Sequence, residues 1–274
     1  IAVGIYCRKS ATDVNGFVLG GRSVGPWLTA FAYGTTYFSA VIFIGYAGQF
    51  GRTFGLASVW IGIGNAIVGT LFAWLVLAKR TKNMTRRLEA KTMPEFFEKR
   101  YGSKNLKLFS AVVIFIFLIP YSASVYNGLS ALFETVFGID GWIIMVALAA
   151  LTALYLFFGG YFATALSDFI QGIIMIFGVC CMIFCFMNHG NVNWNISEII
   201  NDPNLTWFTF GNENASGIYG TTVSLISLTL LTSLGVWALP QTIHKYYAIR
   251  DKKAIKQGII VSTAFALMIG FAEY

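Results

Sequence analysis

Seven apolar stretches of about 20 residues divide this 274-residue sequence, and they constrain its fold more than any other feature. A helix needs about 20 consecutive apolar residues to cross a lipid bilayer. Residues 1–6 look like the end of one more such stretch. The sequence therefore predicts an all-α membrane protein of eight helical segments, the two outermost of them shortened. The seven stretches lie at residues 26–50, 55–78, 107–136, 140–158, 161–187, 219–243 and 256–274.

The composition supports a bilayer environment for these stretches. Hydrophobic residues make up 57% of the chain, charged residues make up 11%, and the mean hydropathy is +0.68. An ordinary soluble domain carries about 25% charged residues. Strands of a membrane β-barrel would be about 10 residues long with alternating polarity, so the longer continuous runs exclude that architecture. We expect a multi-pass protein of the cell (plasma or inner) membrane, surrounded by lipids.

Basic residues fall on alternate connections between the apolar stretches. Of the 19 Lys and Arg residues, 18 lie before residue 23, in Lys79–Lys107 or in Lys245–Lys256, and only Arg52 lies on the other side. Because basic loops stay in the cytoplasm, we expect these connections inside and the acidic segment 188–218 outside. This topology accounts for the net charge of +7, so we expect no nucleic-acid partner.

One cytoplasmic connection contains the sequence TMPEFFEKRYG, near residues 92–102. Pro94 suits a first helical turn, and Phe97 and Tyr101 recur at helical spacing with charges between them. The pattern predicts a short amphipathic helix on the inner membrane surface, with an ordinary solvated linker as the alternative. Elsewhere the pair Gly159-Gly160 predicts a tight turn between two spanning helices.

Sequence signatures of enzymes are missing from the chain. It has no HExxH, GxSxG or P-loop motif, and only His189 and His244 could serve as histidine bases. Cys181, Cys185 and His189 share a helical spacing that a metal could use, but cysteine is common as a small apolar residue in such helices. We therefore expect neither an enzyme with catalytic residues nor a bound transition metal.

Asp168 is the acidic residue that lies well inside an apolar stretch, in GGYFATALSDFIQG. It follows the predicted glycine turn by about eight residues, or ~12 Å of helix. An ionisable residue at that depth is costly, so it is either functional or hydrogen-bonded to a neighbouring helix. No Lys or Arg is expected at comparable depth. Asp168 is therefore predicted to bind a small hard cation such as sodium, which prefers oxygen ligands.

The sequence GTTYFSA, residues 34–40, lies at the centre of the apolar stretch 26–50. Glycine weakens a helix, and small hydroxyl residues can satisfy freed backbone groups, so one interpretation is an unwound segment whose carbonyls coordinate an ion. The alternative is a continuous helix that packs through small residues, with Thr and Ser side chains bonded to the preceding turn. The residues alone fit both interpretations equally well.

Four motifs occur in order along the whole chain: FVLGGRSVGPWLTAFAYGTTYFSAVIFIGYAGQFG, TMPEFFEKRYG, GGYFATALSDFIQG and LPQTIHKYYAIRDKKAIKQG. In this order and spacing the sequence resembles the sodium/solute symporter family, which includes proline, pantothenate, sialic acid and sodium/glucose transporters. The resemblance implies two inverted repeats of five helices, with the binding sites between the broken first helices of the two repeats. It also implies sodium as the coupling ion and a small organic solute as the substrate.

The resemblance divides the chain into four parts. Residues 1–6 would end an extra first helix, residues 26–187 would form the complete first repeat, residues 188–218 would be an extracellular loop, and residues 219–274 would begin a truncated second repeat with two helices. Family members have thirteen or more helices, so we expect further helices after Tyr274.

Matching of motifs also implies binding residues. The backbone carbonyls of Thr35 and Phe38 would coordinate sodium, and Asp168 matches an acidic residue beside the sodium route. The serine and threonine ligands that complete the shared sodium site come from a later helix of the family. Helix packing is an equally good role for the residues between 121 and 127. The implied solute-binding residues are Tyr37, Ser39, Tyr121, Ser124, Tyr126, Asn127 and Thr232.

Two departures from the family bear on the solute. Proline carriers have an aspartate where Tyr37 stands and a tryptophan where Thr232 stands, which disfavours proline. Without a buried Lys or Arg to neutralise an anion, a neutral or zwitterionic solute is favoured.

The expected function is a sodium-coupled symporter that imports a small organic solute by alternating access. The alternatives are a family-related membrane sensor or receptor, which would need a signalling domain, and a channel. A channel would need a continuous polar face, which these helices lack. Nothing in the sequence indicates an oligomeric state.

Overall fold

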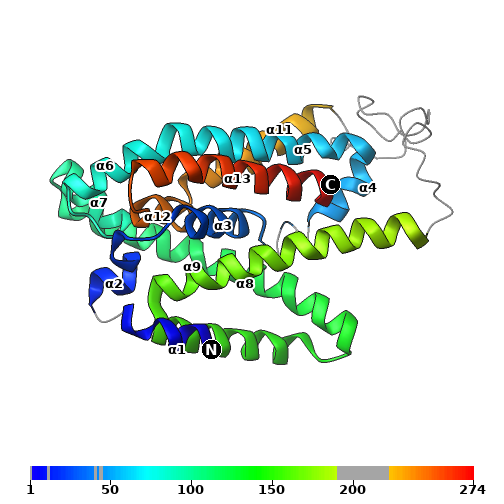
Figure 1. The fold of residues 1–274 in the computed structure, drawn as a ribbon, viewed down its shortest axis with the longest axis horizontal. Coiled ribbons are helices and arrows are strands. Elements are labelled where there is room, and N and C mark those ends of the chain that lie inside the picture. The colour runs from blue at the N-terminus through cyan, green and yellow to red at the C-terminus, as the bar shows by residue number, and fades with distance from the viewer. Residues whose placement is uncertain (1, 11–12, 40–41, 43–45, 190–221) are drawn as a thin grey trace.

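The computed structural model describes residues 2–10, 13–39, 42, 46–189 and 222–274 of the chain (Figure 1). Within these ranges the backbone is almost entirely helical and contains no β-strand, which confirms the predicted all-α membrane fold. The predicted outer loop, residues 188–218, lies almost wholly outside the described ranges. The helices are α1 (Ala2–Cys7), η1 (Arg8–Ser10), α2 (Val14–Leu19), η2 (Gly20–Arg22), α3 (Pro26–Tyr37), α4 (Ala47–Phe54), η4 (Gly55–Ser58), α5 (Val59–Gly64), η5 (Asn65–Phe72), η6 (Trp74–Ala78), α6 (Lys79–Arg87), α7 (Met93–Tyr101), α8 (Lys104–Phe137), α9 (Gly141–His189), α11 (Thr222–Gly235), η8 (Val236–Ala238), α12 (Pro240–Ala248) and α13 (Lys252–Glu273).

Several helices begin and end at side chains that the sequence supplies for this purpose. Thr92, Ser103 and Asp251 cap the N-termini of α7, α8 and α13 by accepting a hydrogen bond from a backbone N–H of the first turn. Gly102 and Gly138 end α7 and α8 in the left-handed conformation that favours glycine. These signals give α7 the bounds predicted for the amphipathic helix to within two residues.

Four described helical segments are long and apolar enough to cross a membrane: Gly55–Arg87, Lys104–Phe137, Gly141–Cys185 and Lys252–Glu273. The pair Thr222–Ala238 and Pro240–Ala248, bent by 50°, would be a fifth. The segment Gly141–Cys185 contains two of the predicted stretches, because α9 reverses direction at Gly160 (φ 54°, ψ −152°). This confirms the predicted glycine turn. The predicted stretch 26–50 is interrupted after α3.

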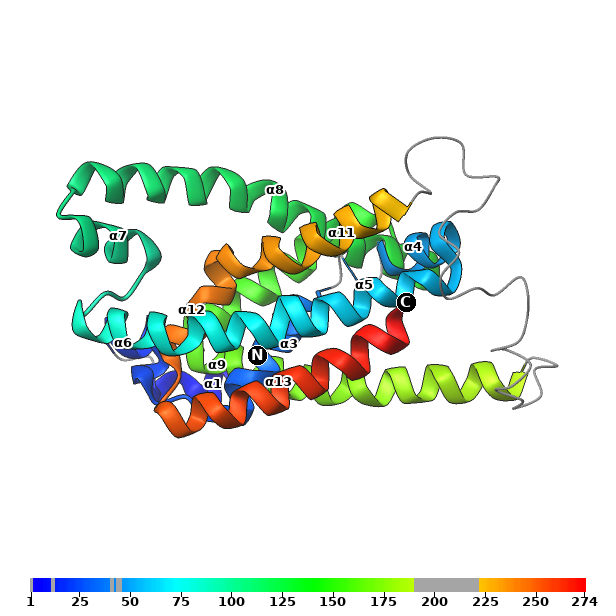
Figure 2. The same cartoon turned by 90° about the horizontal axis from the view of Figure 1, so that it is seen from above.

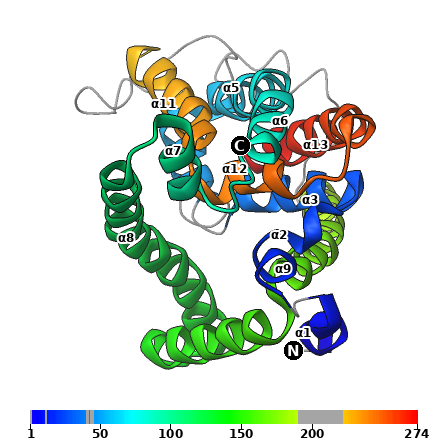
Figure 3. The same cartoon turned by 90° about the vertical axis from the view of Figure 1, so that its left-hand side faces the viewer.

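The buried core lies where α3, α12 and α13 pack against the η5–η6 part of the second spanning helix. Its largest side chains include Tyr33, Trp74, Tyr246 and Phe38, none of them more than 1% exposed. α8 packs mainly against α7 and α9, and Figure 3 shows it to one side of this bundle together with the first half of α9. Two α8 residues are buried, Ser110 and Ser130. The core therefore surrounds α3, the helix that ends in GTTYFSA.

The three basic connections lie together at one end of the bundle (Figure 2). Arg22 Nη2 donates to the Ala90 carbonyl at 2.7 Å, and Arg86 Nη2 donates to the Arg250 carbonyl at 2.7 Å. Val24 and Ile249 form an isolated parallel bridge beside them. Segments far apart in sequence are thus bonded to one another at one end of the bundle, the arrangement expected if the three connections share one side of the membrane.

Candidate functional site

Two helices of the core are broken at the positions where the binding site is expected. α3 ends at Tyr37, and the next residue, Phe38, leaves the helical region (φ −85°, ψ 61°). α11 and α12 are separated by η8 and by Leu239, which is extended. The last four carbonyls of any helix have no partner within that helix. The break between α11 and α12 lies inside a segment long enough to cross a membrane, and the end of α3 lies inside the apolar stretch 26–50.

GTTYFSA contains features of both interpretations that the sequence left open. Residues 34–37 are helical, and Thr35 Oγ1 donates to the Phe31 carbonyl at 2.9 Å, as expected for a threonine bonded to the preceding turn. The helix nevertheless ends at Tyr37. Among the described residues, the carbonyls of Thr35 and Phe38 accept no backbone hydrogen bond beyond the helix end. Ser39 is half-buried at the same break.

Tyr37 and Thr232, two of the predicted solute-binding residues, are in direct contact. The Tyr37 hydroxyl donates to the Thr232 carbonyl at 2.9 Å, and Thr232 Oγ1 donates to Asn65 Oδ1 at 2.8 Å. Ser233 Oγ donates to the same amide oxygen at 3.0 Å. Asn65 is fully buried, and no described residue meets the geometry of a hydrogen bond with its amide Nδ2. This polar cluster joins α3, η5 and α11 inside the bundle.

Four other predicted solute-binding residues lie on α8 and do not reach this cluster. Ser124 and Asn127 are exposed, and Tyr121 and Tyr126 are half-buried. Ser124 Oγ donates to the Tyr121 carbonyl of its own helix at 2.7 Å. Because α8 packs mainly on α7 and α9, the described structure does not bring these four residues together with Tyr37.

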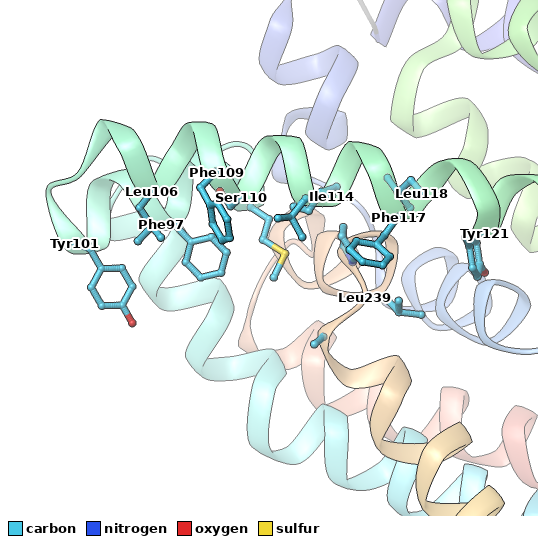
Figure 4. Close-up of a pocket in the computed structure, with 14 residues that line it drawn as sticks. Phe97, Tyr101, Leu106, Phe109, Ser110, Ile114, Phe117, Leu118, Tyr121 and Leu239 are labelled. Carbon is cyan, nitrogen blue, oxygen red and sulfur yellow. The ribbon is translucent and has the colours of Figure 1, made fainter.

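Tyr121 lies at one end of an apolar groove of about 660 Å³ between α7, α8 and the break before α12 (Figure 4). Phe97 of α7, Phe109 and Phe117 of α8, and Leu239 at the break contribute side chains to the groove. The groove runs from α7 to the break between α11 and α12. Tyr121 is therefore the α8 candidate that lies nearest to a break.

Asp168 forms a buried ion pair, which corrects one expectation from the sequence. Lys245 Nζ donates to Asp168 Oδ2 at 3.0 Å, and the two side chains are 7% and 23% exposed. The expectation that no Lys or Arg reaches the depth of Asp168 is therefore wrong. The reason is that α12 begins again at Pro240 after the bend and continues to Ala248. Lys245 thus lies in a helix and not in the following loop.

Aromatic rings surround this ion pair. The Lys245 ammonium lies 5.5 Å from the centre of the Tyr161 ring, within the range of a cation–π interaction. The His244 ring packs edge-on against the same tyrosine, with ring centres 5.3 Å apart. No other described residue hydrogen-bonds to the Asp168 carboxylate, so its second oxygen is available to a ligand.

The Asp168 pair lies close to the end of α3. A methyl group added at Gly172 would lie 3.2 Å from Thr35 Cγ2, so α3 and α9 cross at these residues. Asp168 is four residues, or ~6 Å of helix, from Gly172. The predicted sodium-binding residues Thr35 and Asp168 are thus one helical turn apart across the contact between α3 and α9.

Sequence reasoning missed Lys245 and Asn65. A signal existed for Asn65, the lone amide in the apolar run WIGIGNAIVGTLF, because such a residue in a membrane usually bonds to a neighbouring helix. For Lys245 the signal was Pro240, which begins a new helix and carries the following basic residue with it.

Membrane-length helices that break inside a buried bundle, with an ion pair beside the break, are typical of helical membrane transporters. Residues 17–272 match the sodium:solute symporter family over nearly the whole chain. The chain belongs to this family, a family of transporters and not of enzymes. It is a multi-pass integral membrane protein.

Curated relatives include proline transporters. The chain is 35% identical over 262 residues to the osmoregulated proline transporter OpuE of Bacillus subtilis, covering 93% of this chain and 51% of the relative. It is 32% identical over 261 residues to the sodium/proline symporter of Staphylococcus aureus, covering 93% and 49%. The chain therefore spans about half the length of these relatives.

A solved structure shares the fold. A sodium-coupled sialic acid symporter, in a substrate-bound outward-open state, superposes with a TM-score of 0.71 at 20% identity, covering 99% of this chain and 57% of the other. At this identity the likeness establishes the arrangement of helices and not the substrate.

Proposed function

We propose that the protein couples the entry of sodium to the import of a small organic solute by alternating access. The observation that carries this proposal is the end of α3 at Tyr37, which leaves the Thr35 and Phe38 carbonyls without a described backbone partner in the buried core. Free carbonyls of an interrupted membrane helix are oxygen ligands for a cation such as sodium. The family and the neighbouring sodium-coupled symporter support sodium as the ion.

Asp168 would act beside this site as an acceptor for sodium. Its carboxylate is held by Lys245, so an arriving sodium ion would have to displace the Lys245 ammonium or bind the second oxygen. Lys245 is thus a tethered cation that competes with the free one. Release of Lys245 from Asp168 would also release α12 from α9, which supplies a physical link between ion binding and helix movement.

A neutral or zwitterionic solute fits the charge of this region. Lys245 is a buried basic residue in this region, but Asp168 balances its charge. No net positive charge therefore remains to bind an anionic solute. Tyr37, Ser39 and Thr232 would form one wall of the solute site, and Tyr121 another. The names of the relatives make proline the first compound to test, although Tyr37 and Thr232 differ from proline carriers.

The proposed topology follows the same family map. Residues 26–187 would form the first inverted repeat, residues 188–218 the extracellular loop, and residues 219–274 the start of the second repeat. The basic end of the bundle would face the cytoplasm.

Uptake by the purified carrier in proteoliposomes tests the proposal. With an inward sodium gradient, labelled proline or another neutral or zwitterionic solute should accumulate above its equilibrium level, and a potassium gradient should give no accumulation. Asp168→Asn should weaken the sodium dependence, and Asp140→Asn, at the exposed turn before α9, is the matched control. Equilibration without accumulation would indicate a channel. Absence of uptake for all solutes would favour a sensor.

A further inference from the structure

Lys82 is a buried lysine at the basic end of the bundle whose charge the described residues leave without a direct partner. It lies in α6, and the residue is 3% exposed. Its ammonium forms no hydrogen bond and no ion pair with any part of the chain that the structure describes. The stem of Lys82 is therefore buried, whereas its ammonium is not among the fully buried side-chain atoms, so the charge lies at the edge of the core, where an anion from outside the chain can reach it.

Packing places Lys82 beside the N-terminus of α13. A methyl group added at Gly258 of α13 would meet the Trp74 ring, and one turn further Ala78 packs in the same cluster as Ala254 and Ile255. Lys82 lies one helical turn beyond Ala78, which places it at the level of Asp251, the residue that caps α13. Its electrostatic neighbours are Arg86, Asp251 and Lys252, in agreement with this alignment.

The nearby carboxylate of Asp251 is already bound elsewhere. It accepts hydrogen bonds from the Ala254 N–H at 2.7 Å and from Arg250 Nε at 3.0 Å. The hydrogen bond from Ala254 is the largest influence on this group and holds the pKa of Asp251 below its usual range. One engaged carboxylate therefore faces three cations, those of Lys82, Arg86 and Lys252, and the region carries an excess of positive charge.

We propose that Lys82, Lys252 and the N-terminus of α13 bind the phosphate of an anionic phospholipid from the inner leaflet. Asp251 caps the Ala254 N–H, and the other N–H groups of the first turn, together with the positive end of the helix dipole, favour a further anion there. The Lys82 ammonium supplies a charge at the edge of the core, and the exposed Lys252 closes the site on the outer side. Basic sites between the cytoplasmic ends of spanning helices suit lipid headgroups.

The surface next to the site favours a lipid over free phosphate. Along the second spanning helix, Phe72 and Leu75 are exposed one to two turns before the basic residues of α6. Along α13, Ile260 and Leu267 are exposed beyond Lys256. Both helices thus offer apolar surface for acyl chains directly next to a cationic end, whereas free phosphate would use the cationic end alone.

Lipid binding to the purified, delipidated carrier tests the proposal. Binding of phosphatidylglycerol in mixed micelles is compared with binding of phosphatidylcholine and of inorganic phosphate, by native mass spectrometry and by the thermal midpoint. We expect saturable stabilisation by phosphatidylglycerol, with an affinity lowered about fivefold by Lys82→Gln and about fivefold by Lys252→Gln. Lys104→Gln is the matched control, because Lys104, like Lys252, is the first residue of a capped spanning helix. This variant should leave the affinity unchanged.

The outcomes separate the sources of the anion. Lys252 is exposed, so Lys252→Gln keeps the experiment informative if Lys82→Gln folds poorly. Equal stabilisation by inorganic phosphate and phosphatidylglycerol would overturn the lipid assignment. The site as a whole would be refuted if both Lys82→Gln and Lys252→Gln bound phosphatidylglycerol like the parent protein.

Discussion

Removal of either member of the Lys245–Asp168 pair is expected to lower stability, whereas the two removals should change sodium affinity in opposite directions. Asp168→Asn leaves an ammonium that is 7% exposed without a counter-charge, which should destabilise the protein by about 3 kcal/mol or more. Lys245→Met leaves a carboxylate that is 23% exposed, which water or sodium can reach, so the loss should be nearer ~1–2 kcal/mol. The double variant removes both charges and should recover to within ~1 kcal/mol of the parent.

Sodium affinity provides the sharper test of the tethered-cation mechanism. Asp168→Asn removes an oxygen ligand, and the half-saturating sodium concentration for uptake should rise about five- to 150-fold, the equivalent of ~1–3 kcal/mol. Lys245→Met removes the competing ammonium, so the same concentration should fall about fivefold or more, provided that folded carrier is assayed.

The assays are thermal unfolding in detergent and sodium-dependent uptake in proteoliposomes, measured for the parent, both single variants and the double variant. Lys245→Met would refute the competition mechanism if it raised the half-saturating sodium concentration as Asp168→Asn does. The pair would then only position α12 against α9. An unchanged sodium dependence in Asp168→Asn would remove Asp168 from the sodium site altogether.

Three further predictions concern the backbone and the topology. Thr35→Ala keeps the carbonyl and should change sodium-dependent uptake little, whereas Thr35→Pro reshapes the end of α3 and should abolish it; normal uptake by the proline variant would mean that the break binds no ion. Gly160→Ala should cost about 1–3 kcal/mol and lower the yield of folded carrier, since φ is 54° and a methyl group would lie 2.8 Å from the Phe17 carbonyl. Gly178→Ala, where no atom lies within 4 Å, is its control, and equal yields would contradict the strain argument. In a cysteine-free background, Lys91→Cys should resist an impermeant thiol reagent in intact cells and react after lysis; labelling of intact cells would invert the topology.

The sequence predicted those parts of the fold that depend on local signals. The length of the apolar runs predicted the spanning segments, Pro94 with aromatic residues at helical spacing predicted α7, and Gly159-Gly160 predicted the reversal inside α9. Each of these follows from residues within a few positions of one another. The break after Tyr37 was only half predicted, because glycine and hydroxyl residues suit a packed helix as well as an unwound one.

The site was harder to predict, because it depends on which helix faces which. Lys245 looks like a loop residue until the bend at Leu239 sets a new helix direction. Asn65 gives no clue to its partners, since hydropathy does not show which face of the helix meets Thr232. The α8 candidates fit the family pattern, yet the described helices do not place Ser124 beside Tyr37.

The two lysines of the core, Lys245 and Lys82, are expected to interact with ions of opposite charge. Lys245 is neutralised by Asp168 within the chain, so its partner can be exchanged only for another cation, and this suits competition with sodium. Lys82 has no such partner in the part of the chain that the structure describes, so it is placed to bind an anion from outside. Both act on the same part of the fold, because α12 carries Lys245 and leads directly into the α13 cap beside Lys82. A lipid bound there would hold the C-terminal end of α12, and sodium would release Lys245, which lies three residues before that end. Loss of Lys82 removes neither a sodium ligand nor the competing ammonium, so it should change stability in lipid without changing the sodium concentration at which uptake is half-maximal.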